Sequence, residues 1–435
     1  MAIDNKDKKV LKSSIEREQN EVACSAECEK IKGSKNLNVP PLRFPEFSGE
    51  WKCTTIGNIG DIKNGPFGSV LHAEDYVENG IPIVTTEHFK TGLMPSDKFG
   101  IPQVSNEDYI RLKGYRLETN DIVFSRVGSV DINAHVGIEQ NGWLFSGRVL
   151  RVRPKYDIDS LFLHYALSTE AVKRDIRNRA VGQTMPSINT PILSSTTIQL
   201  PKDLFEQKKV AHFLRLLDER IITQNKIIEK LQSLIKGLSQ QLLSSENDWI
   251  LYRLDDLAQI KSGYSGTQVS YQTPYKVSRI ETISKHCIDI QRIGYVECIP
   301  ESYRLNVGNI LFSNINSIQY IGNTAYLDKD YGLYHGMNLL RIIPNTTIVR
   351  PRFLHLLLCT DWAINHFQTI CNKAVSQASI NQTALGKSRF PIPPMSVQQQ
   401  ICSMFELTER KLDNEQEYIS CLQQQKRYLL QKMFI

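Results

Sequence analysis

Two stretches of the chain place apolar residues alternately three and four positions apart, which is typical of long helices that pack against another helix. The first stretch runs from about residue 207 to residue 244 and the second from 398 to 435. The repeated positions of the first are Leu214, Leu217, Ile221, Gln224, Ile228, Leu231, Ile235, Leu238 and Leu242. Positions 191 residues later hold Phe405, Thr408, Leu412, Glu415, Ile419, Leu422, Lys426, Leu429 and Met433.

The two patterns share one interruption. Gln224 and Glu415 are polar residues at equivalent positions of the apolar stripe, where a buried polar pair fixes the register of two helices at some cost in stability. We therefore expect a two-helix coiled coil. The alternative is a pair of amphipathic helices that lie on separate domains.

The segments between these helices show mixed α and β patterns. Expected strands in the first half are Ile81–Thr85, Asp121–Ser125, Val149–Val152 and Thr196–Leu200, and expected helices are Ser160–Ser168 and Glu170–Asn178. The second half repeats this order with strands at Ile310–Ser313, Leu339–Ile343 and Phe390–Ile392 and a helix at Phe353–Cys359. The fold class is α+β.

The two halves also share short motifs at a nearly constant separation. Trp51 and Trp249 stand 198 residues apart, as do the glycines Gly65 and Gly263 that close the same opening segment. Such a separation is too long for a solenoid repeat and indicates a duplicated domain. The expected domains are a disordered or loosely helical tail at 1–36, globular domains at 37–206 and 245–397, and spacer helices at 207–244 and 398–435.

The chain connectivity predicts how these parts are arranged. A helix from residue 207 to 243 is about 55 Å long, whereas the connector Ser244–Asp248 spans only about 17 Å. The second domain must then begin at the far end of the first helix, and the second helix must return antiparallel to the first. We expect two domains at opposite ends of the helix pair, related by an approximate twofold axis.

Composition places the chain among globular proteins without naming a partner. Hydrophobic residues make up 41% and charged residues 23%, and no apolar run approaches the length of a membrane span. The N-terminus lacks the apolar core of a signal peptide, and the nine scattered cysteines suit free thiols in the cytoplasm. Cys24 and Cys28 have no second ligand pair, so no metal site is expected. The net charge of +6 permits binding to a polyanion without requiring it.

No catalytic motif stands out. An adenine methyltransferase needs an aromatic residue after an Asn/Asp-Pro-Pro loop, but neither Pro40-Pro41 nor Pro393-Pro394 is followed by one. A phosphate-binding P-loop is also missing. His164 and His355 occupy equivalent positions in leucine-rich helices, which is more typical of packing or hydrogen bonding than of metal ligation. We therefore expect a chain without catalytic residues, not an enzyme.

Four motifs, in this order, resemble the specificity subunit of type I restriction–modification enzymes. They are the Pro41-Leu42-Arg43-Phe44-Pro45-x-Phe47 strap, the Gly65-Pro66-Phe67-Gly68-Ser69 turn, the Gly182-Gln183-Thr184-x-Pro186-x-Ile188-Asn189 segment and the Phe205-Glu206-Gln207-Lys208-Lys209 entry to the first long helix. The resemblance extends from about residue 37 to residue 435. The second copy departs from it, with no Pro-Phe-Gly after Gly263 and a Val-Ser-Gln-Ala-Ser run at 375–379.

The resemblance implies function and partners. Each domain would be a target-recognition domain that reads one half of a split double-stranded DNA sequence, and the helices would set the gap and dock other subunits. The implied partners are two adenine-N6 methyltransferase subunits and restriction/translocase subunits, which would carry S-adenosylmethionine, ATP and Mg. The alternative function is a scaffold that binds proteins and not DNA.

Candidate DNA-binding residues are polar or basic side chains on turns beside strands, because such groups bond to base edges and phosphates. In the first domain they are Lys63, Ser69, His72, Thr86, His88, Lys90, Arg126, Ser129, Asn133, Gln183 and Thr184. In the second they are Lys261, Tyr264, Lys276, Arg279, Asn314, Asn316, Gln319, Tyr320, Asn338 and Gln377. Arg126 ranks first because it follows a strand at the start of a Gly/Ser loop.

Overall fold

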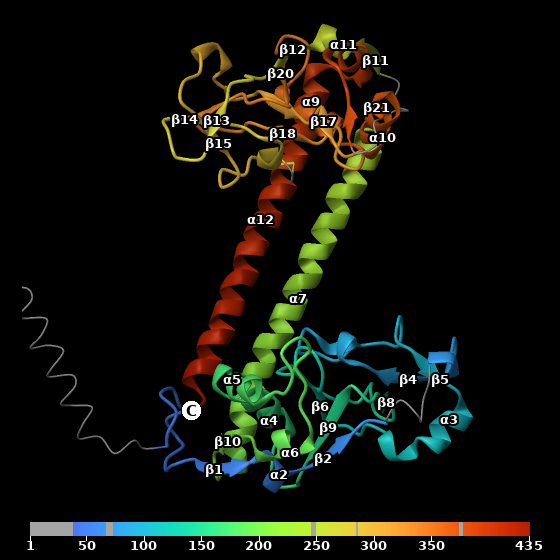
Figure 1. Ribbon diagram of the computed structural model, residues 1–435, viewed down its shortest axis with the longest axis vertical. Coiled ribbons are helices and arrows are strands. Elements are labelled where there is room, and N and C mark those ends of the chain that lie inside the picture. The colour runs from blue at the N-terminus through green and yellow to red at the C-terminus, as the bar shows by residue number, and fades with distance from the viewer. Residues whose placement is uncertain (1–37, 67–72, 245–248, 284–285, 374–376) are drawn as a thin grey trace, which may run out of the picture. The chain divides into compact units, whose positions relative to one another are not determined.

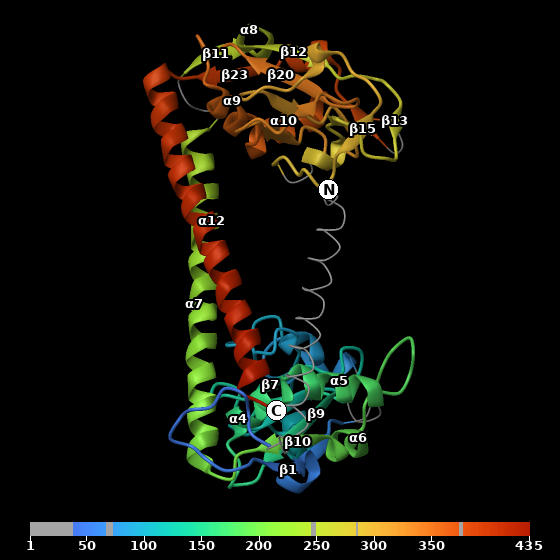
Figure 2. The same ribbon diagram turned by 90° about the vertical axis from the view of Figure 1, so that its left-hand side faces the viewer.

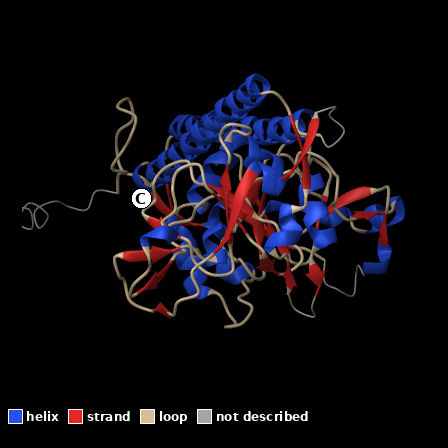
Figure 3. Ribbon diagram, turned by 90° about the horizontal axis from the view of Figure 1, so that it is seen from above, coloured by secondary structure: helices blue, strands red, loops and turns tan. Residues whose placement is uncertain are grey.

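The computed structural model describes residues 38–66, 73–244, 249–283, 286–373 and 377–435 (Figure 1). The chain divides into two compact units. Unit 1 holds the described residues up to Ile222 together with Ser420–Ile435, and unit 2 holds Thr223–Ile419. Both units mix short strands with helices (Figure 3). The expected tail at 1–36 lies outside the described residues.

Unit 1 is built from short elements between residues 52 and 200. Its strands are β1 (Lys52–Thr55), β2 (Gly60–Asn64), β3 (Tyr76–Val77), β4 (Ile81–Val84), β5 (Gln103–Val104), β6 (Ile122–Ser125), β7 (Asn133–His135), β8 (Leu144–Phe145), β9 (Val149–Pro154) and β10 (Thr197–Leu200). Its helices are α2 (Ile56–Ile59), α3 (Asn106–Arg111), α4 (Ser160–Leu167), α5 (Glu170–Arg179) and α6 (Thr190–Ser195).

The strands of unit 1 form two four-stranded sheets, in the orders β2-β9-β6-β7 and β3-β5-β4-β8, and the pair β1-β10. The β6 residues are buried on both faces, which explains why this strand reads as a continuous apolar run. Helix α4 is buried almost all round and packs Phe162 and Leu163 into the main core. The β-branched and apolar runs thus form the centre of the unit, as the sequence predicts.

The strap before β1 packs onto unit 1. The Arg43 guanidinium donates to both carboxylate oxygens of Glu206 at 2.7 Å, and the Trp51 indole donates to the same carboxylate at 3.1 Å. Phe44 lies edge-on to Phe213 with ring centroids 5.9 Å apart. The strap is extended and docked, as the proline content indicates, although Leu42 stays 41% exposed.

Unit 2 repeats this plan. Its strands are β11 (Ile250–Arg253), β12 (Ala258–Ser262), β13 (Gln268–Val269), β14 (Tyr275–Val277), β15 (Gly294–Val296), β16 (Ile310–Phe312), β17 (Ile315–Asn316), β18 (Thr324–Tyr326), β19 (Leu333–Tyr334), β20 (Leu340–Pro344), β21 (Asn372–Lys373), β22 (Ala378–Ser379) and β23 (Arg389–Ile392). Its helices are α8 (Leu254–Leu257), α9 (Pro351–Leu358), α10 (Asp361–Ile370) and α11 (Gln382–Gly386).

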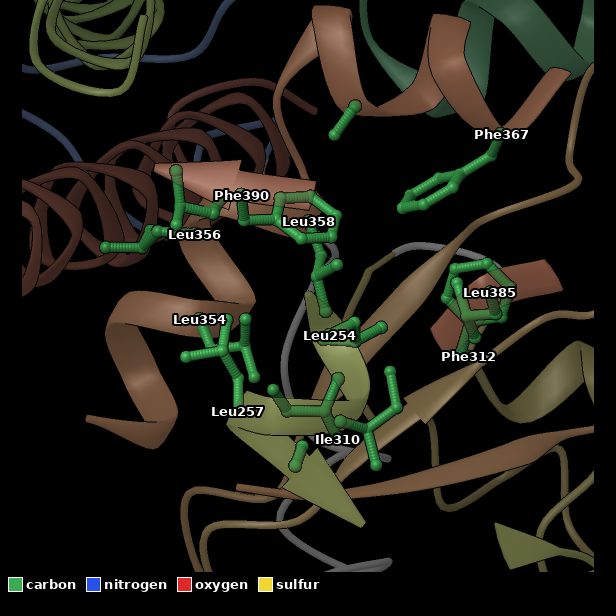
Figure 4. Close-up of a cluster of buried hydrophobic side chains, with 14 of the residues drawn as sticks. Leu254, Leu257, Ile310, Phe312, Leu354, Leu356, Leu358, Phe367, Leu385 and Phe390 are labelled. Atoms are coloured by element: carbon green, nitrogen blue, oxygen red, sulfur yellow. The ribbon is translucent and has the colours of Figure 1, made fainter. Parts of the chain in front are cut away.

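The sheet orders of the two units correspond. The order β12-β20-β16-β18 matches β2-β9-β6-β7, and β13-β15-β14-β19 matches β3-β5-β4-β8. Figure 4 shows the core of unit 2, where Phe312 and Phe367 meet edge-on at 5.0 Å and Leu254, Leu354 and Phe390 point into the same cluster. Among the described residues, the three-stranded sheet β17-β22-β21 has isolated bridges as its counterpart in unit 1.

The two long helices are α7 (Leu204–Leu242) and α12 (Met395–Lys432). The residues of the expected apolar stripe are buried or half-buried in both helices, whereas Leu216, Leu234 and Leu407, off the stripe, are 49%, 50% and 65% exposed. Each helix begins three residues earlier than the heptad pattern indicated. In α7 the reason is a cap, since the Phe205 amide donates to Asp203 Oδ1 at 2.8 Å, and a cap leaves no heptad signal.

Contacts between α7 and α12 are found within each unit. In unit 2, Gln224 Nε2 donates to the Glu415 carboxylate, and Ile235 packs in the same cluster as Phe405. In unit 1, Lys426 Nζ lies 2.5 Å from Asp218 Oδ1. Gln224 and Glu415, which occupy equivalent positions in the two helices, are therefore hydrogen-bond partners.

Both histidines of the leucine-rich helices are buried and hydrogen-bonded. His164 Nδ1 lies 2.7 Å from Asn133 Oδ1, and His355 Nδ1 lies 2.9 Å from Arg352 Nη1. Burial lowers the pKa of each imidazole to about 3, so both are neutral at physiological pH. They are packing and hydrogen-bonding residues, as the sequence predicted. Among the described residues, no helix combines the length and apolar character that crossing a bilayer requires.

Candidate nucleic-acid interface

A tight turn at Ser146–Arg148, here called hub 1, gathers several predicted residues of unit 1. The Ser146 amide donates to the Val84 carbonyl at 2.9 Å, which brings in the segment before Thr86. The Arg126 amide donates to the Arg148 carbonyl at 3.0 Å, and Arg126 Nη1 donates to the Gly147 carbonyl at 3.0 Å. Three chain segments that are distant in sequence therefore meet at one turn.

A glycine ends the opening segment of each copy because the backbone of a neighbouring turn lies too close for any side chain. A Cβ atom on Gly65 would lie 2.0 Å from the Ser146 carbonyl oxygen, and one on Gly263 would lie 1.8 Å from the Gly336 carbonyl oxygen. No side chain fits at either position. The repeated glycines thus allow the strand that carries Lys63 or Lys261 to pass directly over the hub.

Next to hub 1, two loops of unit 1 are joined through their backbones. They are residues 126–132 and 180–188, here called loop pair 1. The Gly128 amide donates to the Pro186 carbonyl at 2.8 Å, and the Ile188 amide donates to the Arg126 carbonyl at 2.9 Å. Arg126, Ser129, Gln183 and Thr184 are thereby brought together, and all except the half-buried Arg126 are exposed.

Unit 2 has an equivalent turn at His335–Asn338, here called hub 2. The Tyr264 amide donates to the His335 carbonyl at 2.9 Å, and the Gly336 amide donates to Ser278 Oγ at 3.1 Å, directly before Arg279. Asn338 has a positive φ of 64° and an exposed side chain. Tyr264, Arg279 and Asn338 are therefore neighbours around one turn, as their counterparts are in unit 1.

Loop pair 2 consists of residues 314–323 and the described part of 372–380. The Ile380 amide donates to the Asn314 carbonyl at 2.8 Å, which reproduces the bond between Ile188 and Arg126. Asn316 shapes its own turn, since its Oδ1 accepts from the Ser317 amide at 2.8 Å. Gln319, Tyr320 and Gln377 are exposed on this loop pair, as are Lys261 and Lys276 on the neighbouring strands.

The remaining predicted residues of unit 1 have local roles. His88 Nδ1 accepts from the Thr85 amide at 3.1 Å and so caps the short helix Thr86–Phe89, and burial lowers the pKa of this imidazole. Lys90 pairs with Glu87 and stays exposed. The Lys63 ammonium lies 5.1 Å from the centre of the Tyr115 ring. The ammonium groups of Lys63 and Lys90 can therefore bind a ligand, whereas the His88 ring is used in a hydrogen bond to the backbone.

One candidate is corrected. Asn133 is 2% exposed on β7, where its Oδ1 accepts from His164 Nδ1 and its Nδ2 donates to Ser168 Oγ at 3.2 Å. Its amide is used inside the core, so it has no route to a base or phosphate. The sequence pattern showed a polar residue after a Gly/Ser loop, but not that the next strand had already begun. Ser69 and His72 lie outside the described residues.

Sequence reasoning missed some residues of these surfaces. Arg148 is exposed at hub 1, beside Arg126. The Ser-Gly-Arg sequence before a strand could have identified it as a candidate turn residue. Val181 and Met185 are 65% and 67% exposed on loop pair 1, and Ile318 is 44% exposed on loop pair 2. A search restricted to polar residues could not find these apolar side chains.

Comparison with known proteins agrees with the duplicated architecture. The model of the type I restriction modification DNA specificity domain matches the chain twice, over residues 48–233 and 246–424. The putative type I restriction enzyme MjaX specificity subunit of Methanocaldococcus jannaschii is 38% identical over 193 residues, which are 43% of this chain and 45% of that protein. The MjaVIII specificity subunit of the same organism is 24% identical over 82% of this chain and 85% of its own length.

A crystal structure of the S subunit of a type I restriction–modification system from M. genitalium has the same fold. Its TM-score is 0.59 at 16% identity, over 91% of this chain and 99% of that chain. With two matches that together cover most of its length, the chain belongs to the family of type I restriction–modification DNA specificity subunits.

Proposed function

We propose that this chain is the DNA-reading subunit of a type I restriction–modification complex, in which each unit binds one half of a split target. The observation that carries the proposal is the duplication of one surface. In each unit two loops are joined by the same backbone bond, from the Ile188 amide to Arg126 in unit 1 and from the Ile380 amide to Asn314 in unit 2, while the exposed side chains differ. Two surfaces with the same backbone arrangement but different exposed side chains are suited to recognise two different DNA sequences.

The mechanism combines two weak contacts. We propose that α7 and α12 form an antiparallel coiled coil with the units at its opposite ends. The opposite chain directions of the two helices within unit 2 support this, because Gln224 meets Glu415 while Ile235, further along α7, shares a cluster with the earlier residue Phe405. Once one unit binds, the second contact is intramolecular, so the affinities multiply. Half-sites on one DNA face would then lie about 34 Å apart.

The chain would act through partners. We assign methyl transfer and cleavage to other subunits, which would bring S-adenosylmethionine, ATP and Mg. Two methyltransferase subunits and the restriction/translocase subunits would dock on the long helices.

A methylation experiment tests the function. The chain is expressed with its methyltransferase partner in a host that lacks adenine methylation, and the modified sites are sequenced. We expect one bipartite motif with a fixed gap. Gln183→Ala should then weaken or relax recognition in one half-site and Gln377→Ala in the other, each by about 1–3 kcal/mol at the affected position. The exposed Gln232 on α7 supplies the control, Gln232→Ala, which should change neither half.

The helix pair is tested separately. Insertion of one heptad into the middle of α7, with a matching insertion in α12, should change the gap of the methylated motif and leave both halves as they were. An unchanged gap would contradict the spacer role. Binding that responds weakly to salt, with no methylated motif, would favour the protein-binding scaffold over a DNA reader.

A further inference from the structure

The exposed apolar tip of loop pair 1 is held on a rigid frame. Residues 181–187 form a hairpin closed by two hydrogen bonds between Val181 and Ser187, both of 2.9 Å. Gly182 has a φ of +99°, and a Cβ atom there would lie 2.9 Å from the Met185 carbonyl oxygen, so only glycine allows the turn. In Figure 2 the green loop between α5 and α6 stands out from unit 1. Its shape is therefore fixed before any ligand binds.

This hairpin presents Val181 and Met185 to solvent. They are 65% and 67% exposed, and neither packs in a hydrophobic cluster of the described residues. Gln183 and Thr184 stand between them and are exposed as well. Because the backbone of the turn is preorganised, little backbone freedom is lost when a partner covers these two side chains.

The charges around the hairpin indicate what that partner is. Helix α5 leads directly into the hairpin and carries four cations, Lys173, Arg174, Arg177 and Arg179, against two carboxylates, Glu170 and Asp175, which leaves a net charge of +2. Arg177 Nη1 lies 2.5 Å from Asp131 Oδ2, which ties α5 to the other loop of the pair. Arg174 is exposed and makes no ion pair with the described carboxylates. A basic helix next to an apolar tip suits DNA, whose phosphates surround the apolar faces and methyl groups of its bases.

We propose that Met185 and Val181 make apolar contacts with the bases of the half-site that unit 1 reads. The inference rests on the proposed function and adds specificity-determining residues to it. Such a contact takes one of two forms, a contact with a thymine methyl group in the major groove or insertion at a base step. In both forms the apolar side chain, and not the hydrogen bonds of Gln183 and Thr184 alone, contributes to base selection.

Unit 2 presents apolar side chains from the other loop of its pair. The segment from Ser313 to Thr324 is three residues longer than the equivalent segment from Ser125 to Asn133. The added turn carries Ile318 and Tyr320, which are 44% and 48% exposed. Tyr320→Ala should therefore weaken recognition of the half-site that unit 2 reads and leave the half-site of unit 1 unchanged, which makes it a control for the Met185 variants.

The experiment uses the full chain with its methyltransferase partner and duplexes that contain the methylated motif. Affinity is measured for the parent protein and for Met185→Ala, Met185→Leu and Val181→Ser. The control is Ile138→Ala, because Ile138 is 69% exposed on a different loop of unit 1. One duplex series carries 2-aminopurine in the unit 1 half-site, which reports unstacking, and another replaces each thymine by deoxyuridine, which removes its methyl group.

We expect Met185→Ala to weaken binding about 5- to 30-fold, a loss of about 1–2 kcal/mol, and Met185→Leu to restore most of it. A 2-aminopurine signal lost in Met185→Ala supports insertion. A deoxyuridine penalty lost in Met185→Ala supports the methyl contact. The proposal is overturned if Met185→Ala binds as the parent does, or if it weakens assembly with the methyltransferase and not DNA binding. If the parent itself fails to select the motif, the proposed function fails instead.

Discussion

The two units contain different polar groups in one equivalent buried cluster around a histidine. In unit 1, the buried cluster behind β7 consists of Asn133, His164 and Ser168, where His164 Nδ1 donates to the asparagine oxygen. In unit 2, the positions 191 residues later hold Thr324, His355 and Cys359. There the Thr324 hydroxyl lies 3.2 Å from the Cys359 sulfur, whose distance to His355 Nε2 is 3.5 Å.

The neighbours of the histidines set opposite tautomers. Asn133 Oδ1 can only accept, so His164 carries its proton on Nδ1. Arg352 Nη1 can only donate, so His355 Nδ1 accepts, and the proton lies on Nε2, toward Cys359. The duplicated fold therefore requires a neutral, hydrogen-bonded imidazole at this place, but it leaves the choice of partners open.

The link between each globular part and its long helices differs in the same way. In unit 1, the Tyr165 hydroxyl donates to Asp218 Oδ2 at 2.8 Å, and Lys426 pairs with the other oxygen. In unit 2, Arg352 on α9 pairs with Glu409, which is the equivalent of Asp218. The Asp218 side chain is 12% exposed, whereas the Glu409 side chain is 37% exposed. The comparison suggests that the buried link contributes more to stability.

Removal of the two equivalent carboxylates tests this difference. Asp218→Ala should lower the free energy of unfolding of unit 1 by about 2–3 kcal/mol, because it leaves a half-buried ammonium and a buried hydroxyl without their acceptor. Glu409→Ala should cost less than about 1 kcal/mol in unit 2, since the Glu409 carboxylate is partly exposed and solvent screens its pairing with Arg352. Hydrogen exchange of the α4 and α9 amides measures each unit by itself. Equal losses at the two sites would contradict the assigned difference.

The matched histidines predict an acid-sensitive fold with the same slope in both units. Burial lowers the pKa of His164 and of His355 to about 3, against an ordinary value of 6.5. Protonation favours the unfolded chain, so stability is complete above pH 6.5 and falls as the pH decreases from 6.5 toward 3. Each histidine accounts for about 1.4 kcal/mol per pH unit, which makes about 2 kcal/mol at pH 5.

The measurement is the unfolding free energy of each unit, by hydrogen exchange, between pH 7 and pH 5. His164→Gln should flatten the slope in unit 1 only, and His355→Gln in unit 2 only. The charged neighbours that lower the pKa of His164 are His135, Lys426 and Lys173, and those that lower the pKa of His355 are Arg352 and His286. All of them stay unchanged in the two variants. An unchanged slope in both variants would show that other groups cause the acid sensitivity.

Much of the frame was predictable because it depends on periodic patterns. The central strands, α4, α5 and α9 lie within a few residues of their expected positions, and the polar pair Gln224–Glu415 was identified from one shared interruption. Helix α10 was missed although Thr360 caps it and Ala363 and Phe367 form a buried stripe, because a helix of ten residues gives only a short run of this pattern. Strands of two residues, such as β13 and β17, are too short for any period.

The candidate interface was predicted less well, because exposure depends on tertiary contacts. Asn133 and Asn316 both follow Ser-containing loops, yet the first is a core residue and the second shapes its own turn. Arg126 was chosen for its place after a strand, and its guanidinium donates to a hub carbonyl. Such contacts join segments far apart in sequence, so no local pattern encodes them.

The smallest expected effect comes from exchanging the two equivalent cap residues, Ser168 and Cys359. Burial raises the pKa of the Cys359 thiol to about 11, so it remains protonated and acts as a small, weakly polar group. Cys359→Ser should change the stability of unit 2 by less than about 1 kcal/mol, because a hydroxyl can make the same contacts with Thr324 and His355. Ser168→Cys should be similarly small in unit 1. Cys359→Val keeps the volume but removes the polar contacts and should cost more than the serine variant. Were Cys359→Val to be as stable as Cys359→Ser, the shared cluster would be apolar packing, and the argument that both units need a hydrogen-bonded imidazole would lose its support.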